Sequence, residues 1–268
     1  MTAGMVSLEC VSFGVEFRLA ACSKALLESM WKRAPFGAAV RAAGCGDVQR
    51  FALLISPGGD GYRLEAGDEV VGESAELPPV LDQLACDLMV HVANHAPDRV
   101  FVHAGVAGWQ DRAVVLPGTT FAGKTTLVAE LVRAGATYYS DEYAVLDEHG
   151  RVHPYARSLQ MREGGGVEQR CVAVEELSGR AGIGPLEVSH VVFTEYVAGG
   201  RWKPEPVSAG MAVLEMMRHA IPVQRTPARV MATLAKMMEM ATAVRSERGE
   251  ASETARRLIA AMSAGPGV

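Results

Sequence analysis

The segment Leu116-Pro117-Gly118-Thr119-Thr120-Phe121-Ala122-Gly123-Lys124-Thr125-Thr126 decides the fold of this chain. From Gly118 to Thr125 it fits the pattern G-x-x-x-x-G-K-[ST] at every position. The two glycines let the backbone curl so that consecutive N–H groups point inward at a polyphosphate. A helix that begins directly after such a loop adds the positive end of its dipole at the same point. The segment therefore predicts a phosphate-binding loop.

The pattern also assigns chemical roles within the loop. Lys124 is expected to reach the β- and γ-phosphates, and the Thr125 hydroxyl is expected to ligate Mg²⁺. The predicted cofactors are therefore ATP and Mg²⁺. The residues predicted to contact the nucleotide are Gly118, Thr119, Thr120, Phe121, Ala122, Gly123, Lys124, Thr125 and Thr126.

Both flanks of the loop have the expected character. Residues 112–116 are short, apolar and β-branched, which is typical of a strand. Residues 126–134 carry Leu127 and Leu131 at helical spacing, and Gly135 is a stop signal. The order strand, loop, helix is the context that this motif requires. A glycine-rich turn without a ligand does not require these flanks, so nucleotide binding is the favoured interpretation.

Overall composition excludes several classes of protein. The chain has 268 residues, 49% of them hydrophobic and 21% charged, as expected of an ordinary globular protein. Its formal charge of -5 gives no electrostatic reason to expect a nucleic-acid partner. No apolar run reaches the length of about 18 residues that a membrane span needs. We therefore expect neither nucleic-acid binding nor membrane insertion.

The cysteines and the start of the chain indicate the compartment. The cysteines are odd in number and never spaced as C-x-x-C, which argues against a zinc site and a disulfide framework. The first residues show no basic segment followed by an apolar one, as a signal peptide would. A cytoplasmic location is the simplest expectation. The cysteines are Cys10, Cys22, Cys45, Cys86 and Cys171.

The hydrophobic pattern predicts an α/β (α+β) chain with three regions. Residues 1–76 read as a small strand-rich α+β region, and residues 77–208 as the core that contains the phosphate loop. Residues 209–268 read as a helical region packed on that core. The helices predicted there are 212–219, a second that begins at Pro227 and runs to about Val244, and 251–262, with residues 245–250 as a solvated connection.

The strand before the loop is predicted to arrive through a hairpin. Residues 99–107 read as a strand, residues 108–111 as a turn and residues 112–116 as the partner strand. Most P-loop NTPases instead reach their loop strand by a crossover from a parallel strand. The phosphate loop is therefore expected on a mixed, hairpin-rich sheet.

Two acids follow the next strand. Residues 136–139 are apolar and lead at once into Ser140, Asp141 and Glu142. Such a strand normally lies beside the loop strand, which would place its terminal carboxylates near the γ-phosphate. Acids at a strand end can also simply form a turn, and that alternative stays open. In the functional interpretation, the two acids are a base and a metal ligand for phosphoryl transfer.

The order of these features resembles a known family. His103 lies one strand before the loop, and the acidic pair lies one strand after its helix. The segment from Val100 to Asp147 resembles the catalytic domain of HPr kinase/phosphorylase, which has a His-Gly strand, a P-loop and an Asp-Asp pair in this order. It is also similar to shorter HPr-kinase-like proteins, including kinases of lasso-peptide precursors. Residues 138–143 and 151–155 are of that shorter type.

The resemblance implies a fold and a set of roles. The fold would be the one shared by HPr kinase and phosphoenolpyruvate carboxykinase, with a P-loop on a mixed sheet. Asp141 would be the base that activates a hydroxyl nucleophile, with His103 near it. Glu142 would support Mg²⁺ beside Thr125. The resemblance further points to a homo-oligomer.

The chain also departs from the family pattern. The His-Gly pair is His103-Ala104 here, and the acidic pair is Asp-Glu. The later motif Leu-Glu-Ile-Arg-Gly corresponds loosely to residues 159–162, where Gln160 replaces a metal-ligating Glu and Arg162 would stabilise charge on the transferred phosphoryl group. Residues 1–98 do not match the N-terminal domain of the family. HPr itself is therefore not the expected substrate, and the phosphorylase activity is not carried over.

The sequence therefore predicts a Mg²⁺-dependent kinase that transfers the γ-phosphoryl group of ATP to a hydroxyl. A serine of a peptide or protein is the favoured acceptor, and a small hydroxylated metabolite is the alternative within enzymes. From another class, a nucleotide-binding regulatory protein without transfer activity stays open. The residues expected to act in catalysis are Asp141, His103, Lys124 and Arg162, and those expected to hold the metal are Thr125 and Glu142.

Overall fold

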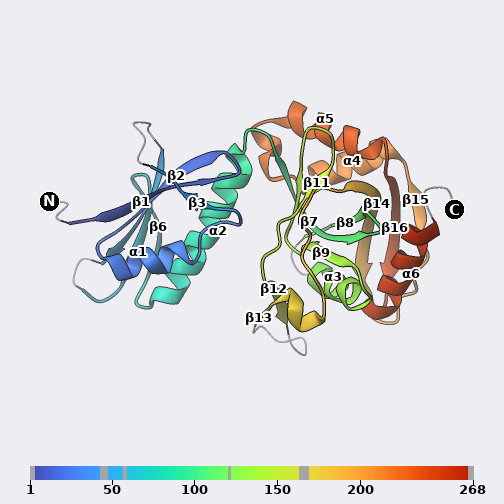
Figure 1. The fold of residues 1–268 in the computed structure, drawn as a ribbon, viewed down its shortest axis with the longest axis horizontal. Helices are drawn as coiled ribbons and strands as arrows, with labels where there is room; N and C mark the ends of the chain where they lie inside the picture. Colours follow the sequence, from blue (N-terminus) through green and yellow to red (C-terminus); the bar gives the residue numbers. More distant parts are fainter. Residues whose placement is uncertain (1–3, 43–47, 57–58, 120–121, 163–168, 265–268) are drawn as a thin grey trace. The chain divides into compact units, whose positions relative to one another are not determined.

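The structure is a computed structural model that describes residues 4–42, 48–56, 59–119, 122–162 and 169–264 (Figure 1). The chain divides into two compact units, Met1–Asp98 and Arg99–Val268. Both units combine helices with sheets, so the predicted mixed α/β class is confirmed. No helix in the described part of the chain is both long and apolar enough to cross a membrane.

The first unit is a six-stranded sheet in the order β3-β1-β2-β4-β5-β6. Strands β2 and β4 are parallel and are connected through helix α1, whereas β1 and β2 form a hairpin. The fully buried side chains of its core include Phe17, Leu19, Met30, Leu53 and Leu64. The elements of the sheet are β1 (Val6–Ser12), β2 (Val15–Ala21), α1 (Lys24–Trp31), β3 (Ala39–Val40), β4 (Gln49–Ile55), β5 (Tyr62–Ala66) and β6 (Glu69–Ser74).

Helix α2 (Leu77–His95) corrects the predicted domain boundary. The sequence placed the boundary between residues 76 and 77, which assigned this helix to the core with the phosphate loop. In the structure α2 packs on β5 and β6 and contacts α1. Its buried side chains, which include Leu84 and Leu88, form an apolar stripe that must pack against other elements, and here it packs within the first unit. The first unit therefore ends after the helix, at Asp98.

The second unit contains the phosphate-loop segment on an eight-stranded mixed sheet. The order is β11-β10-β7-β8-β14-β16-β15. Strand β9 pairs with β7 and not with the loop strand β8, beside which the sequence placed it. Strands β8, β14 and β16 are mutually parallel, whereas β7, β9, β10, β11 and β15 pair antiparallel with their neighbours. The strands are β7 (Val100–Trp109), β8 (Arg112–Pro117), β9 (Thr137–Ser140), β10 (Tyr143–Leu146), β11 (Val152–His153), β14 (Glu187–Tyr196), β15 (Glu205–Val207) and β16 (Thr242–Arg248).

The predicted hairpin before the loop is confirmed. Strands β7 and β8 pair from Trp109 opposite Arg112 to Ala104 opposite Pro117. The turn residues Gln110 and Asp111 both have left-handed backbone angles, with φ of 48° and 63°. Two such residues form the type of tight turn whose twist matches that of the flanking strands. The turn therefore fixes the register that delivers the chain to Gly118.

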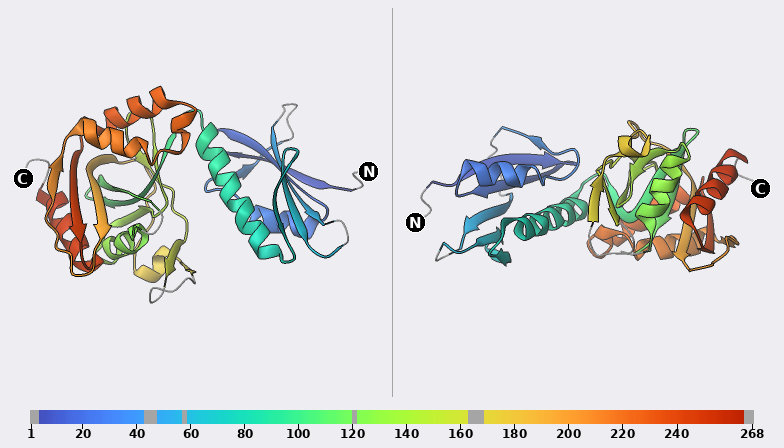
Figure 2. Two further views of the ribbon diagram at one scale, coloured as in Figure 1. Left: turned by 180° about the vertical axis from the view of Figure 1, so that it is seen from behind. Right: turned by 90° about the horizontal axis from the view of Figure 1, so that it is seen from below.

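Helices cover both faces of this sheet (Figures 1 and 2). Along β8 the side chains alternate, so that Ala113 and Val115 pack with α4 and α5, while Val114 and Leu116 pack with α3 and α6. In Figure 1 the orange α4 and α5 lie across the sheet from the green α3. The helices are α3 (Lys124–Arg133), α4 (Ala209–Met217), α5 (Pro227–Met238) and α6 (Ala251–Ala264).

Strand β16 corrects the prediction for the C-terminal region. The sequence predicted a helix to about Val244 and a solvated connection over 245–250, but α5 ends at Met238 and residues 242–248 form a strand. This strand lies between β14 and β15, so both of its edges are hydrogen-bonded. Ser246 and Arg248 are only 5% and 2% exposed. Pairing with two strands outweighs local helix propensity here, and the region 209–268 is helical only in part.

A small ribbon completes the second unit. Strands β12 (Leu159–Arg162) and β13 (Gln169–Val172) pair only with one another, and Leu159 is buried in the cluster that also contains the apolar side of α3. The two short 3-10 helices are η1 (Val174–Leu177) and η2 (Ile221–Gln224). The ribbon is therefore attached to the helix that follows the phosphate loop.

We predict that Gly105→Ala destabilises the second unit. A Cβ at Gly105 would lie 2.7 Å from the Val128 Cγ2 atom on α3, which would push the helix away from the sheet. The expected loss in the free energy of unfolding is about 1–3 kcal/mol, measured by urea denaturation of the full chain. Gly210→Ala in α4 is the matched control, because a Cβ there meets open space. Equal stabilities of the two variants would contradict the packing argument.

Candidate functional site

The predicted order of strand, loop and helix is observed around the phosphate-loop segment. Strand β8 ends at Pro117 and α3 begins at Lys124. Gly123 precedes the helix in the left-handed conformation, with φ of 76°. A Cβ on Gly118 would lie 3.2 Å from that of Ala122, so the loop closes tightly on itself. Thr120 and Phe121, which were also predicted to contact the nucleotide, lie outside the described residues.

The Lys124 ammonium lies along the loop. It donates hydrogen bonds to the carbonyl oxygens of Gly118 at 3.0 Å and Thr119 at 2.7 Å. Burial lowers the pKa of Lys124 to about 8, although the negative charges of Asp141 and Glu142 act in the opposite direction. Both carboxylates are therefore close enough to influence the loop lysine. The structure brings the predicted cation and the predicted acidic pair to the same place.

Strand β7 joins the loop to the acidic pair through its backbone. The N–H of Gly118 donates to the His103 carbonyl at 3.4 Å, and the N–H of Ala104 donates to the Glu142 carbonyl at 3.1 Å. His103 also stands opposite Tyr143 in the ladder between β7 and β10. A single dipeptide of β7 is therefore hydrogen-bonded to the start of the loop and to the acids.

The acidic pair is held by two hydroxyl groups. The Ser140 Oγ accepts the N–H groups of Glu142 at 3.0 Å and Tyr143 at 2.9 Å, which fixes the turn between β9 and β10. The buried Tyr138 hydroxyl donates to Asp141 Oδ1 at 2.8 Å. Burial and the two carboxylates raise the pKa of Tyr138, so it stays a donor. Sequence reasoning missed this contact, although a buried tyrosine on a strand requires a partner for its hydroxyl.

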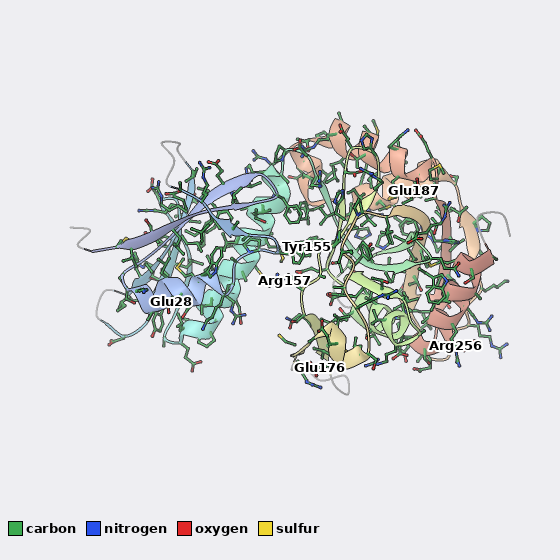
Figure 3. The ribbon with its side chains drawn as sticks, viewed as in Figure 1. Glu28, Tyr155, Arg157, Glu176, Glu187 and Arg256 are labelled. Carbon is green, nitrogen blue, oxygen red and sulfur yellow. The ribbon has the colours of Figure 1, made fainter. Side chains whose placement is uncertain are left out.

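Glu142 carries the second carboxylate of the pair. Burial raises its pKa, the charge of Asp141 acts in the same direction, and the guanidinium of Arg157 and the ammonium of Lys124 act against both. The Arg157 Nη1 atom lies 3.7 Å from Glu142 Oε2. Arg157 comes from the irregular segment between β11 and β12, close in sequence to Tyr155 (Figure 3). No local pattern in that segment marks Arg157, so the sequence could not reveal it.

Two histidines meet beside the loop. The backbone N–H of His103 donates to the carbonyl of His219 at 2.8 Å, and Val102 forms an isolated bridge with Ala220. Burial, Lys124 and His219 lower the pKa of His103 to about 4, so its imidazole is neutral at physiological pH. Burial also lowers the pKa of His219. His103 can therefore donate or accept a hydrogen bond but does not contribute a charge.

Arg162 stands apart from these residues in the topology. It is the last residue of β12 and pairs with Gln169 in the two-stranded ribbon, outside the main sheet. Its side chain lies outside the described part of the structure. Gln160, two residues earlier, donates to the Cys171 Sγ at 3.1 Å. The catalytic role predicted for Arg162 stays a prediction.

The donor set around the loop fits Mg²⁺ held jointly with a nucleotide. Magnesium is usually bound by one or two carboxylates together with phosphate oxygens and water, rather than by a cage of protein ligands. Thr125 lies on the first turn of α3, and Asp141 and Glu142 act on the adjacent Lys124. In the described ranges no three His, Cys, Asp or Glu side chains gather as a closed metal site. The hydroxyl and the carboxylates present suit a hard cation.

The first unit also has an open depression, lined by polar side chains that include Ser56, Asp60, Arg63 and Glu73. The Arg63 Nε atom donates to Glu73 Oε1 at 2.6 Å, so these two charges neutralise one another. The depression therefore offers less to a charged ligand than the loop of the second unit does.

Several solved structures resemble this chain, and one of them is an enzyme of known description. It is described as the HPr(Ser) kinase/phosphatase from Coxiella burnetii, with a TM-score of 0.30 and 12% sequence identity. The match covers 59% of this chain and 96% of that chain. No protein-family model and no curated protein sequence matches. At this TM-score the likeness is loose.

We predict that nucleotide binding takes up protons at alkaline pH. The Lys124 pKa of about 8 means that the ammonium is mostly intact near pH 7 and mostly lost near pH 9. A bound polyphosphate favours the ammonium, so binding at about pH 9 must recover a proton and the affinity falls as the pH rises through about 8. Calorimetry in two buffers of different ionisation enthalpy measures this uptake.

The control for this experiment is Lys124→Ala. The variant lacks the ammonium, so it should bind nucleotide more weakly and show no lysine-linked proton uptake. Proton uptake of the same size in Lys124→Ala and in the unaltered chain would contradict the placement of Lys124 at the phosphates.

We also predict that Tyr138→Phe reduces the phosphoryl transfer expected from the sequence without weakening nucleotide binding. The variant removes the hydroxyl that orients Asp141, and we expect a loss of about tenfold in kcat with little change in the Kd for ATP. Tyr139→Phe is the matched control, because its hydroxyl donates to the Gly184 carbonyl at 2.7 Å. Each variant should lose about 1 kcal/mol of stability. Equal kcat values in the two variants would argue against a role for Tyr138 in positioning Asp141.

Proposed function

We propose that the chain is a Mg²⁺-dependent kinase that transfers the γ-phosphoryl group of ATP to a hydroxyl. The observation that carries the proposal is the junction on β7, where backbone hydrogen bonds tie the phosphate-loop segment to the Asp141–Glu142 turn. Phosphoryl transfer requires a nucleotide cradle and a carboxylate close together, and the catalysis is largely positioning and electrostatics. The proposal places both requirements in this one site.

In the proposed step the acceptor hydroxyl displaces ADP from the γ-phosphorus of ATP. Asp141 accepts the proton of the acceptor hydroxyl while the oxygen of that hydroxyl bonds to the γ-phosphorus. The bond between that phosphorus and the β–γ bridging oxygen breaks, and ADP leaves. Lys124 and the loop amides hold the phosphates, and Tyr138 holds Asp141 in orientation. Thr125 and Glu142 would hold Mg²⁺, which neutralises charge on the β- and γ-phosphates when it is bound.

The resemblance of residues 100–147 to HPr kinase/phosphorylase supports the same conclusion from the sequence alone. We extend the proposal to the fold shared by that family and phosphoenolpyruvate carboxykinase. The hairpin of β7 and β8 and the mixed sheet are consistent with this extension. The substitution of Asp by Glu at position 142 preserves the charge of the pair.

We further propose that the acceptor is a serine of a peptide or protein. The observation that favours a polypeptide is the apolar surface of the helices next to His219. Met211 and Leu214 on α4 are 56% and 57% exposed, and Met231 on α5 is 51% exposed. His219 follows α4 directly and its carbonyl contacts the site. Flexible methionine side chains suit the binding of an extended chain.

The acceptor can be identified by mass spectrometry. The full chain is incubated with ATP and Mg²⁺ together with a peptide library that contains serine, and in parallel with a pool of hydroxylated metabolites. A phosphate added to serine peptides supports the proposal, whereas a phosphate added only to a metabolite would show that the acceptor is a small molecule. ATP binding with no product in either pool would favour a regulatory protein.

We predict that Asp141→Asn abolishes transfer and preserves ATP binding. The amide oxygen of Asn still accepts the Tyr138 hydroxyl, but it is a far weaker base than the carboxylate. Loss of a general base typically reduces the rate by about 10²–10⁴-fold, while the Kd for ATP should stay within about twofold because Asp141 is not assigned to the phosphates. Full activity in this variant would refute the assignment of Asp141 as the base.

A further inference from the structure

Arg248 is a buried cation that forms no salt bridge with a carboxylate of the described residues. It is the last residue of β16 and only 2% exposed. The other fully buried charged side chain in the described part of the chain is Asp147, which pairs with Arg151 at 2.9 Å and with His153 at 2.9 Å. No carboxylate of the described residues forms such a pair with Arg248. Asp147 is therefore paired with cations, whereas Arg248 has no salt-bridge partner among the described residues.

The Arg248 guanidinium contacts the end of the phosphate loop. Its Nη2 atom donates to the Gly123 carbonyl at 3.0 Å, and its Nη1 atom donates to the Gly249 carbonyl at 3.1 Å. The guanidinium carbon lies 5.5 Å from the centre of the Tyr196 ring. The Nε atom is buried without a hydrogen-bond partner. The direct contacts of this cation among the described residues are therefore with carbonyl oxygens and an aromatic ring.

These contacts compensate only part of the cost of burial. Removing a charged group from water costs several kcal/mol, and an arginine without a counter-ion recovers less of it than a paired one. Glu250 is the acidic residue whose charge acts on Arg248, but burial outweighs it and lowers the arginine pKa. A negative charge bound nearby would complete the compensation.

The sheet places Arg248 at the edge where such a charge would bind. Strands β8, β14 and β16 run parallel, so their carboxyl ends meet at one edge. The phosphate-loop segment follows β8, Tyr196 ends β14 and Arg248 ends β16. Ligands of parallel sheets bind outside the carboxyl ends of the strands. The N-terminus of α3, with its positive partial charge, lies at the same edge.

Gly123 shows how closely the arginine approaches. A Cβ at this position would lie 2.2 Å from the Arg248 Nη2 atom, so even alanine would displace the guanidinium. The Gly123 carbonyl also accepts the N–H of Leu127 at 3.1 Å in the first turn of α3. The same oxygen therefore joins Arg248 to the start of the helix. Holding this peptide group fixes the direction of the last part of the loop.

We propose that Arg248 is a positioning residue of the phosphate loop, whose guanidinium holds the Gly123 carbonyl and whose charge is complemented by a polyphosphate bound in the loop. The inference rests on the nucleotide site of the proposed function and adds a residue that lies outside the loop motif. The chemical class of the ligand is the polyphosphate of a nucleoside triphosphate, and inorganic tripolyphosphate shares it. The nucleoside part is not required for this electrostatic complement.

The test measures ligand binding to the full chain by calorimetry, at a temperature where circular dichroism shows every variant folded. The probes are ATP with Mg²⁺ and inorganic tripolyphosphate with Mg²⁺. Arg248→Met removes the charge and both hydrogen bonds but keeps an unbranched side chain. Arg245→Met is the matched control, because Arg245 lies on the same strand, is exposed and pairs with Glu215.

We expect Arg248→Met to raise the Kd for both probes by about tenfold or more, because the end of the loop loses its hydrogen bond to Arg248 and the site loses a nearby positive charge. The Kd values of Arg248→Lys should fall between those of that variant and of the unaltered chain. Lysine keeps the charge but cannot make both hydrogen bonds, to the Gly123 and Gly249 carbonyls, which we call the two-point hold. Arg245→Met should leave both Kd values unchanged. A role for Arg248 in stability alone would instead lower the unfolding midpoint and leave the Kd of the folded variants unchanged.

The outcomes separate this inference from the function on which it rests. If the unaltered chain binds neither probe, the nucleotide site itself is refuted and the inference fails with it. If the unaltered chain binds both probes and folded Arg248→Met binds them equally well, only the role of Arg248 is refuted. If Arg248→Met does not fold, Arg248→Lys decides, and an unchanged Kd in that variant overturns the two-point hold.

Discussion

The pairing of strand β7 on both of its edges is the constraint on which the candidate site depends. On one edge Ala104 stands opposite Pro117, directly before the phosphate-loop segment, and on the other Tyr143 stands opposite His103. These ladders are made by the backbone, and a shift by one residue would turn every side chain of β7 to the opposite face. The distance between loop and acids is therefore set by the sheet register. Side chains such as Tyr138 then adjust the orientation of Asp141.

Burial and neighbouring charges together set the electrostatics of the candidate site. Burial lowers the pKa of Lys124, whereas two carboxylates raise it. Burial and the adjacent Lys124 lower the pKa of His103 and keep its imidazole neutral. Two carboxylates close to a triphosphate would repel it unless a cation stood between them. Under the proposed function, Glu142 and the Thr125 hydroxyl would therefore suit a metal-bound nucleotide better than a free one, in line with the small number of carboxylates that Mg²⁺ takes from a protein.

The features that could be predicted from the sequence are those encoded in short segments of the chain. The loop motif, the hairpin before it and the acids after β9 are encoded in short segments, and the structure shows the corresponding elements. Arg157 and His219 were missed because each reaches the site from an irregular segment whose position depends on the whole sheet. The boundary at residue 76 was wrong because α2 satisfies its apolar stripe against the preceding strands. No pattern within the helix itself states which neighbour it will cover.

The misreading of residues 242–248 and the significance of Arg248 have one physical cause. A run with alternating charges reads as a solvated connection when it is judged alone. In the sheet it is a strand with partners on both edges, and its alternate side chains must point inward regardless of their charge. Natural sheets rarely bury a cation in this way without a reason. Because β16 is parallel to β8 and ends at the same edge, the buried guanidinium meets the loop backbone. In a solvated connection the side chain of Arg248 would be ordinary. At the end of β16 it lies where a cation can act on the phosphate loop.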